Sequence, residues 1–189
     1  MQNEIKVWDP LVRLFHWTLV GSFTIAMVSG DDFTLIHSWA GYTILSLLII
    51  RIVWGVIGTR YARFTDFVKS PSVALHYIKD LLLMRAPRYV GHNPAGGLMI
   101  IALITSLLIT SVMGLIILAD EENAGPLAGR IDSFPHWLLE LLEETHEAFA
   151  YFTLALVIMH VVGVFIEMIF HGENLIASMI NGRKRRVLK

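Results

Sequence analysis

The chain has 189 residues, of which 55% are hydrophobic and only 16% are charged, and its mean hydropathy is +0.62. This composition is too apolar for a soluble domain of that length, so we expect a membrane protein, and the formal net charge of −1 says little about partners. The sequence contains no cysteine, which excludes disulfides, thiolate-bound iron–sulfur clusters, CxxCH attachment and cysteine zinc sites. The eight histidines are the available ligands for a redox group.

In chain order, four apolar stretches are long enough to cross a hydrocarbon core of about 30 Å, which requires about 20 residues. They cover residues 11–30, 37–58, 96–118 and 147–170. The first residues lack the basic start and cleavage site of a removable signal peptide, so we expect the first stretch to be retained. The predicted fold is an all-α membrane four-helix bundle with short interfacial helices, formed by one domain over residues 1–189.

The connections between these stretches differ in charge, and basic residues gather in alternate connections, as the positive-inside rule describes. The basic regions contain Lys6, Arg13, Arg60, Arg63, Lys69, Lys79, Arg85, Arg88, Arg183, Lys184, Arg185, Arg186 and Lys189. The other connections are acidic and contain Asp31, Asp32, Asp120, Glu121, Glu122, Asp132, Glu140, Glu143 and Glu144, with Arg130 as their basic residue. We therefore predict that both termini are cytoplasmic and that the acidic loops face outside.

Two connecting segments have the pattern of interfacial helices. In PSVALHYIKDLLLM, between the second and third stretches, apolar residues recur at spacings near three and four, which predicts a short amphipathic helix. The segment SFPHWLLELLEE precedes the fourth stretch, with Pro135 near its start and Trp137 suited to the headgroup region. We expect this segment to form a separate helix on the outer surface.

The fourth stretch contains the most informative residues of the chain, His146 and His160, which are fourteen positions apart. In an α-helix this separation is about 40° short of four turns and rises about 21 Å, so both imidazoles face the same side at different depths. Ionisable side chains inside a membrane are costly and by default mark a functional site. The spacing therefore predicts two stacked cofactors.

The predicted orientation gives each of these histidines a partner at its own depth. His37 begins the second stretch on the outside and matches His146, whereas His16 lies on the cytoplasmic half of the first stretch and matches His160. Facing helices of a bundle commonly build cofactor sites, and a porphyrin held between two imidazoles needs such cross-helix pairs. We predict that His37 and His146 bind an outer haem iron and that His16 and His160 bind an inner one.

Other residues near these histidines have candidate roles. Arg51 lies toward the cytoplasmic end of the second stretch, where it is predicted either to bind a propionate of the inner haem or to extend to the membrane interface. Arg13 is a second candidate for a propionate, or a topology signal. Gly21, Gly41 and Gly163 leave room either for a flat macrocycle or for close helix packing.

The segments VWDPLVRLFHW, RIVWGVIGTRYARFTDFVKSP, GHNPAGG, ETHEAFA and NLIASMINGRKRR occur in this order over nearly the whole chain. Together they resemble the bacterial dihaem cytochrome b561 and nickel–iron hydrogenase cytochrome b subunit family. In that family the ligand histidines correspond to His16, His37, His146 and His160. The resemblance implies two non-covalent b haems, electron transfer across the bacterial cytoplasmic (inner) membrane, and a quinone or quinol as a redox partner.

The remaining histidines, His76, His92, His136 and His171, are expected at the membrane interfaces. Two of them have an alternative role: His92 in a cytoplasmic quinone pocket and His136 in an outer partner site. The basic tail is expected to fix topology and to contact anionic lipid rather than nucleic acid.

The function expected from these features is electron transfer between the quinone pool and a periplasmic redox protein, such as a cytochrome c or a hydrogenase. Because two histidine ligands leave iron no position for oxygen, electron transfer is expected rather than oxygen activation at the metal. An electron-transfer subunit is favoured over a stand-alone enzyme. One alternative is a self-contained superoxide:quinone oxidoreductase. A haem-free, histidine-lined transporter of protons or metal ions is another.

Overall fold

A computed structural model describes residues 4–30, 33–131 and 133–185 of the chain. Five charged residues that entered the predicted topology lie outside the described residues, namely Asp31, Asp32, Asp132, Arg186 and Lys189.

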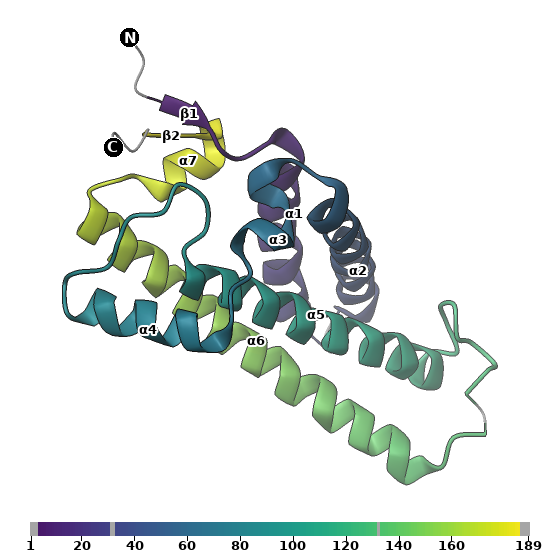
Figure 1. Ribbon diagram of the computed structural model, residues 1–189. Helices are drawn as coiled ribbons and strands as arrows, with labels where there is room; N and C mark the ends of the chain where they lie inside the picture. Colours follow the sequence, from purple (N-terminus) through teal and green to yellow (C-terminus); the bar gives the residue numbers. More distant parts are fainter. Residues whose placement is uncertain (1–3, 31–32, 132, 186–189) are drawn as a thin grey trace. The chain divides into compact units, whose positions relative to one another are not determined.

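Four long helices contain the predicted membrane spans, and each is long and apolar enough to cross a bilayer (Figure 1). They are α1 (Pro10–Ser29), α2 (Thr34–Ile57), α5 (Pro94–Glu121) and α6 (His136–His171). A proline opens both α1 and α5, at a position where the missing N–H has no partner within the helix in any case. The all-α class and the four spans are confirmed.

The separate outer helix predicted before the fourth span is wrong. Instead, α6 starts at His136 and continues without interruption to His171. No proline or glycine occurs between Pro135 and Gly163, so nothing in the sequence breaks the helix where the composition changes from acidic to apolar. The change in composition therefore separates two parts of one helix.

Shorter elements connect the long helices. They are β1 (Glu4–Lys6), η2 (Arg60–Ala62), α3 (Phe64–Phe67), α4 (Pro71–Leu82), α7 (Leu175–Asn181) and β2 (Arg183–Arg185). The amphipathic helix predicted between the second and third spans is confirmed as α4. It buries Ala74 and Tyr77, whereas Leu75 and Leu82 remain exposed, as suits a helix that contacts lipid at an interface.

The chain divides into two compact units. Unit 1 consists of residues 1–17, 50–102 and 156–189, and unit 2 of residues 18–49 and 103–155. In unit 1 the apolar core is built around Val7, Trp8 and Val12. In unit 2 it is built around Ile44, Leu48 and Leu107, and the single-domain organisation stays a prediction.

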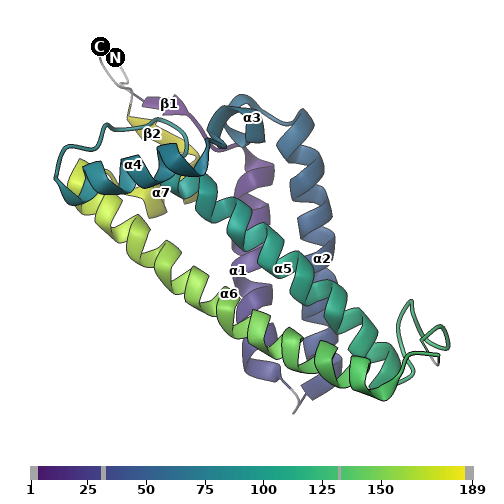
Figure 2. The same ribbon diagram turned by 60° about the horizontal axis from the view of Figure 1, so that its bottom comes forward.

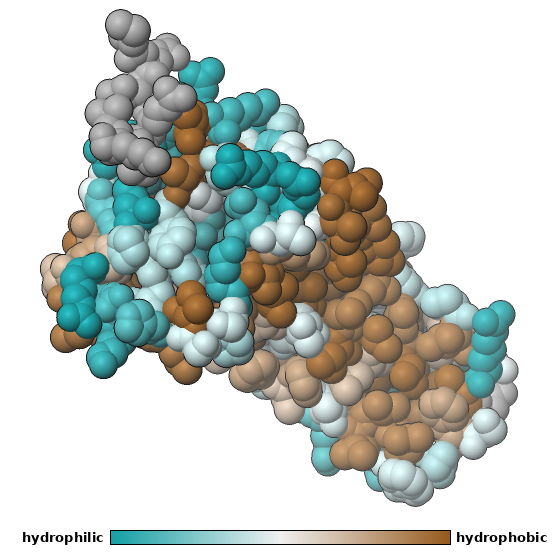
Figure 3. Space-filling view, in the orientation of Figure 1, coloured by the Kyte–Doolittle hydropathy of each residue, from teal (hydrophilic) through white to brown (hydrophobic). Residues whose placement is uncertain are grey.

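The surface is largely apolar over the long helices, and polar residues gather over the connecting segments (Figure 3). Large aliphatic side chains on the spans are strongly exposed, including Val28 at 80% and Ile169 at 83%. In a chain with these spans, such side chains are expected to contact the hydrocarbon of the bilayer.

The two ends of the described chain pair as strands in unit 1, a feature that the sequence did not reveal. Strands β1 and β2 are antiparallel and lie side by side in both views (Figures 1 and 2). The turn into β2 requires Gly182, whose φ is 81° and whose position would bring a Cβ within 2.6 Å of the Trp8 carbonyl oxygen. Any other residue there is strained by both effects.

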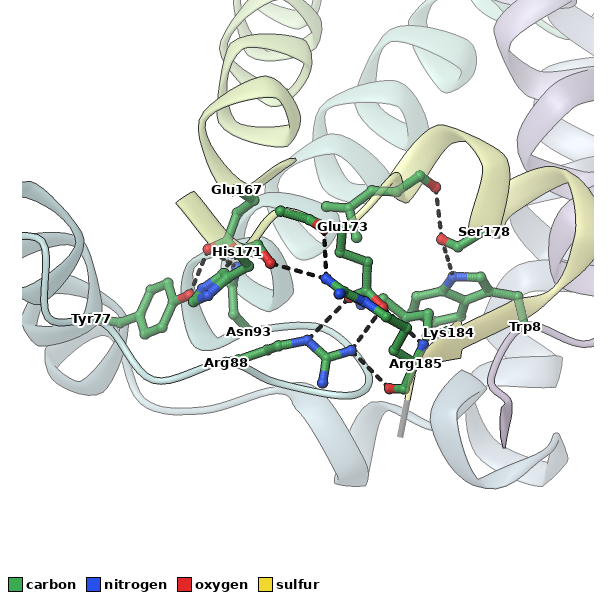
Figure 4. Close-up of polar contacts among 12 residues, drawn as sticks. Trp8, Tyr77, Arg88, Asn93, Glu167, His171, Glu173, Ser178, Lys184 and Arg185 are labelled. Atoms are coloured by element: carbon green, nitrogen blue, oxygen red, sulfur yellow. Dashed lines mark hydrogen bonds and ion pairs between the residues drawn. The ribbon is translucent and has the colours of Figure 1, made fainter. Parts of the chain in front are cut away.

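A buried ion cluster holds the same tail. The carboxylate of Glu173 accepts hydrogen bonds from Arg88 at 2.7 and 3.2 Å and from the Arg185 amide at 2.9 Å, and Lys184 Nζ lies 3.8 Å away (Figure 4). Burial raises the pKa of Glu173, but the hydrogen bonds from Arg88 and Arg185 and the nearby Lys184 outweigh it, so the pKa is lowered overall. The cluster therefore favours the ionised carboxylate.

Replacement of Glu173 by Ala is expected to destabilise the protein by about 3–5 kcal/mol, because it leaves buried cations without their counter-ion. The midpoint of thermal unfolding in detergent, followed by tryptophan fluorescence, measures the loss. Since the pKa of Glu173 is lower in the folded chain, its contribution is complete above the ordinary value of 4.5 and declines as the pH falls below it. The matched control is Glu4→Ala, whose side chain is 50% exposed near Arg183; an equal loss there would contradict the account.

Candidate functional site

The structure brings His37 and His146 together within unit 2, as the depth argument predicts. His37 lies in the first turn of α2 and His146 lies on α6, and their ring centres are 6.1 Å apart with an interplanar angle of 63°. The two rings therefore approach each other from different helices without stacking.

Each of these two rings is oriented by a backbone carbonyl. His37 Nδ1 lies 3.0 Å from the Ala26 carbonyl oxygen, and His146 Nδ1 lies 2.9 Å from the Thr110 carbonyl oxygen. A carbonyl oxygen only accepts, so the proton of each neutral ring is assigned to Nδ1 and the lone pair to Nε2. This is the tautomer and the support that an imidazole needs to bind a metal through Nε2.

A mostly apolar cavity of about 90 Å³ adjoins both rings. Besides the two histidines, its lining includes Phe23, Gly41 and Leu107. No atom lies within 4 Å of a Cβ built at Gly41, so the space beside this residue is open. The site thus combines two oriented imidazoles with room for an apolar group.

His16 and His160 both belong to unit 1, on α1 and α6. The Nδ1 atom of His16 is buried and has no hydrogen-bond partner among the described residues. Beside Gly163, three positions after His160, a Cβ would meet nothing within 4 Å. The second predicted pair is therefore present in one unit, and space is left next to it.

Arg51 is only 4% exposed, so its side chain is enclosed by protein, and both roles considered for it stay predictions. Its guanidinium carbon lies 4.9 Å from the centre of the Phe64 ring and 5.9 Å from that of Phe67. One terminal nitrogen, Nη1, is buried without a hydrogen-bond partner among the described residues. Such a nitrogen is costly unless an acceptor binds it.

Arg13 contacts the C-terminal segment of the chain, and the two roles considered for it stay predictions. Its guanidinium donates to the Ile180 carbonyl oxygen, and the neighbouring Trp17 donates from Nε1 to the Met179 carbonyl oxygen at 3.3 Å. The carbonyl groups of the last turn of α7 have no donors within the helix, and these two bonds supply donors for two of them. Arg13 therefore holds α7.

Asp9 organises the start of α1 and was not singled out from the sequence. Its carboxylate accepts from the Val12 amide at 3.0 Å, Trp54 Nε1 at 3.1 Å and Thr59 Oγ1 at 2.6 Å. Burial raises the pKa of Asp9, yet these hydrogen bonds, led by that of Thr59, lower it overall. An aspartate directly before a proline that opens a helix was the available signal.

His92 lies between aromatic rings in unit 1, with its ring centre 4.5 Å from that of Trp8 and 4.7 Å from that of Phe67. Burial, and then the positive charges of Arg51 and Lys184, lowers the pKa of His92 to about 3, so the ring is neutral near pH 7. Its Nδ1 is buried without a hydrogen-bond partner among the described residues.

His92 also lines a cavity of about 290 Å³ in the same unit. The wall combines apolar side chains with polar and charged ones and includes Arg60, Tyr61, Asp66, Phe67, Lys69, Tyr89 and Val90. His92 therefore lines a cavity, and its alternative role in a quinone pocket stays a prediction.

The other three histidines each lie near a carboxylate one helical turn away. His76 lies 3.5 Å from Asp80 and His136 lies 3.4 Å from Glu140, and both histidines are exposed. His171 is 12% exposed and lies 3.4 Å from Glu167. Exposure of His76 and His136 agrees with their expected positions at interfaces, whereas His171 is more enclosed than expected.

Comparison with known proteins identifies the family. A family model described as prokaryotic cytochrome b561 matches residues 7–182. The chain belongs to the prokaryotic cytochrome b561 family. It is therefore a membrane cytochrome b, a haem-b protein that transfers electrons, and this favours the redox interpretations over a haem-free transporter.

Curated relatives resemble the chain along nearly its whole length. A probable Ni/Fe-hydrogenase B-type cytochrome subunit of Azotobacter chroococcum mcd 1 is 24% identical over 215 residues, covering 96% of this chain and 88% of the relative. The protein of the same name from Rhizobium leguminosarum bv. viciae is 25% identical over 219 residues, covering 97% and 90%. No solved structure matches the chain with comparable significance.

The residues of unit 2 fit a haem between His37 and His146. Two metal–imidazole bonds of about 2 Å, with about 1 Å from each nitrogen to its ring centre, place two ring centres about 6 Å apart. The observed distance is 6.1 Å. In unit 1, the buried Nη1 of Arg51 lacks a hydrogen-bond partner among the described residues and suits a carboxylate, which a haem propionate would supply. The Nδ1 of His16 lacks the carbonyl partner that the Nδ1 atoms of His37 and His146 have.

Filling the outer cavity is expected to lower haem content. Gly41→Phe places a large ring where the glycine leaves open space, so we expect the haem bound per chain to fall by about half while the helices still form. A pyridine haemochrome assay and circular dichroism measure the two quantities. The control Leu35→Phe lies nearby on α2 with its side chain 72% exposed and should keep its haem; full haem content in Gly41→Phe would contradict the site.

Proposed function

We propose that the chain is a dihaem cytochrome b of the bacterial cytoplasmic membrane, which transfers electrons between the quinone pool and a periplasmic redox protein. His37 and His146 are the axial ligands of one b haem, and His16 and His160 are those of the other. The observation that carries the proposal is the 6.1 Å pairing of His37 and His146, with each Nδ1 bonded to a carbonyl oxygen.

When bound, the two haems supply centres that gain and lose one electron at a time. The protein's part is to position the imidazoles that would hold the haems. The Ala26 and Thr110 carbonyls set the ring orientation of the His37 and His146 pair. Histidine on both sides of each iron leaves no coordination position for oxygen, so the expected activity is electron transfer.

Arg51 is proposed to bind a propionate of the haem held by His16 and His160. Its side chain is fixed against Phe64, and its Nη1 lacks a hydrogen-bond partner among the described residues. A carboxylate would supply that partner in a charge-assisted hydrogen bond. All of these residues belong to unit 1.

We assign the quinone to the 290 Å³ cavity lined by His92. A quinone headgroup needs hydrogen-bond donors for its carbonyl oxygens and apolar surface for its ring, and this cavity offers His92 and Tyr89 beside Phe67 and Val90. His92 and the proposed haem ligands His16 and His160 all belong to unit 1. Conversion of a quinone to a quinol takes up two electrons and two protons, and the reverse reaction releases them.

The proposed orientation has both termini in the cytoplasm. The distribution of basic residues supports it, and the pairing of β1 with β2 supports a common side for the two ends. The periplasmic partner is proposed to be a cytochrome c or a hydrogenase, because curated relatives are named as hydrogenase cytochrome subunits. The acidic connection between α5 and α6, with Glu122, provides charge for docking a basic surface.

The histidine pairs predict a definite haem stoichiometry. His146→Ala and His160→Ala should each retain one haem per chain, and the double variant should retain none, because each histidine serves a different site. A pyridine haemochrome assay normalised to protein measures this. The control is His136→Ala, an exposed histidine on the same helix, which should keep both haems. Two haems per chain in either single variant would contradict the assignment.

A further inference from the structure

Glu167 is a largely enclosed carboxylate in unit 1 that has no role in the proposed haem sites. It lies on α6 seven positions after His160, and its side chain is 14% exposed. One oxygen, Oε1, accepts two hydrogen bonds, from Tyr77 Oη at 2.5 Å and from Asn93 Nδ2 at 2.7 Å (Figure 4). The other oxygen, Oε2, lies 3.4 Å from His171 Nε2. The carboxylate therefore links α6 to α4 and to the segment before α5.

Both donors hold the segment that forms one wall of the quinone cavity. Asn93 directly follows His92, and its Oδ1 accepts from the Gly96 amide at 2.7 Å at the start of α5. The Tyr77 ring lies edge-on to that of Tyr89, with 5.6 Å between their centres. Tyr89 and His92 both line the cavity. Glu167 thus reaches the two ends of this wall through one intermediate residue each.

The hydrogen bonds to Glu167 depend on an acceptor at Oε1. Burial and then the hydrogen bond to Glu167 raise the pKa of Tyr77, so its hydroxyl keeps the proton that it donates. Without an acceptor at this point, two enclosed donors would lose their partner, and the wall segment would rearrange to reach another one.

We propose that Glu167 is a positioning residue of the quinone site. Acting through Asn93 and Tyr77, it holds His92 and Tyr89 at the spacing that a quinone headgroup requires. This role belongs to the oxygen that accepts the two hydrogen bonds, and not to the negative charge. The inference rests on the proposed quinone function of the cavity.

The test is the steady-state reduction of the purified haem protein by a short-chain quinol analogue, measured for wild type and three variants. Glu167→Leu removes the acceptor, and we expect the KM for the quinol to rise at least about tenfold with kcat and haem content unchanged. Glu167→Gln keeps an acceptor oxygen and should restore the KM to within about twofold of wild type. The matched control is Asp80→Leu, a carboxylate with 17% side-chain exposure that bonds Arg85; neither residue is among those that line the cavity.

The outcomes separate this inference from the function on which it rests. A wild-type protein that no quinol reduces contradicts the quinone assignment itself. If quinol reduces the wild type and Glu167→Leu has the same KM, the role of Glu167 is contradicted but the quinone assignment is not. The role of Glu167 is also contradicted if the KM of Glu167→Gln rises as much as that of Glu167→Leu. If Glu167→Leu fails to accumulate with haem, Tyr77→Phe removes one donor and should raise the KM about threefold; an unchanged KM there also overturns the proposal.

Discussion

The structure depends on the high free-energy cost of an ionisable or polar group in a membrane interior without a partner. Most enclosed polar groups in the described residues meet this constraint with a partner from another element. In unit 1, Glu173 binds Arg88, Glu167 binds Tyr77 and Asn93, and Asp9 binds Trp54 and Thr59. The buried nitrogens without a hydrogen-bond partner among the described residues belong to Arg13, His16, Arg51, His92 and His171. Those of His16, Arg51 and His92 are in residues assigned to the proposed haem and quinone sites.

The same constraint explains how a chain with exposed apolar helices obtains a defined site. Hydrophobic burial distinguishes poorly between one helix face and another when lipid is equally apolar, so polar contacts specify the arrangement. Within unit 1 these contacts join segments more than 70 positions apart, as between Asn93 and Glu167. Within unit 2, Ser106 and Thr153 make a buried hydroxyl contact of 2.6 Å, and the carbonyls of Ala26 and Thr110 orient the histidines. Rigid support of this kind is what preorganises a cofactor site.

The features that follow from local periodicity were predictable from the sequence, and those that require distant pairing were not. Hydropathy predicted the four spans, and helical spacing with charge topology predicted the pairing of His37 with His146, whose rings the fold brings together. The pairing of His16 with His160 stays a prediction. Local composition gave a wrong prediction for α6, where it suggested a separate helix before the fourth span, because acidic and apolar residues belong to one uninterrupted helix. The pairing of β1 with β2 and the contacts of Glu173 and Glu167 have no signal in a single sequence, because each joins segments far apart in the chain. Arg51 was recognised, but only the fold shows that it is enclosed by aromatic rings.

The central claim is that four histidines on three helices hold two haem irons, each between two imidazoles. Both candidate pairs include a residue of α6, and each pair belongs to a different compact unit. Electron paramagnetic resonance of the oxidised, purified protein, quantified against protein concentration, tests this claim most directly. The account predicts two low-spin ferric centres per chain, as expected for iron with two strong nitrogen ligands. A single centre per chain, or a substantial high-spin signal from an iron with an open coordination position, would contradict it.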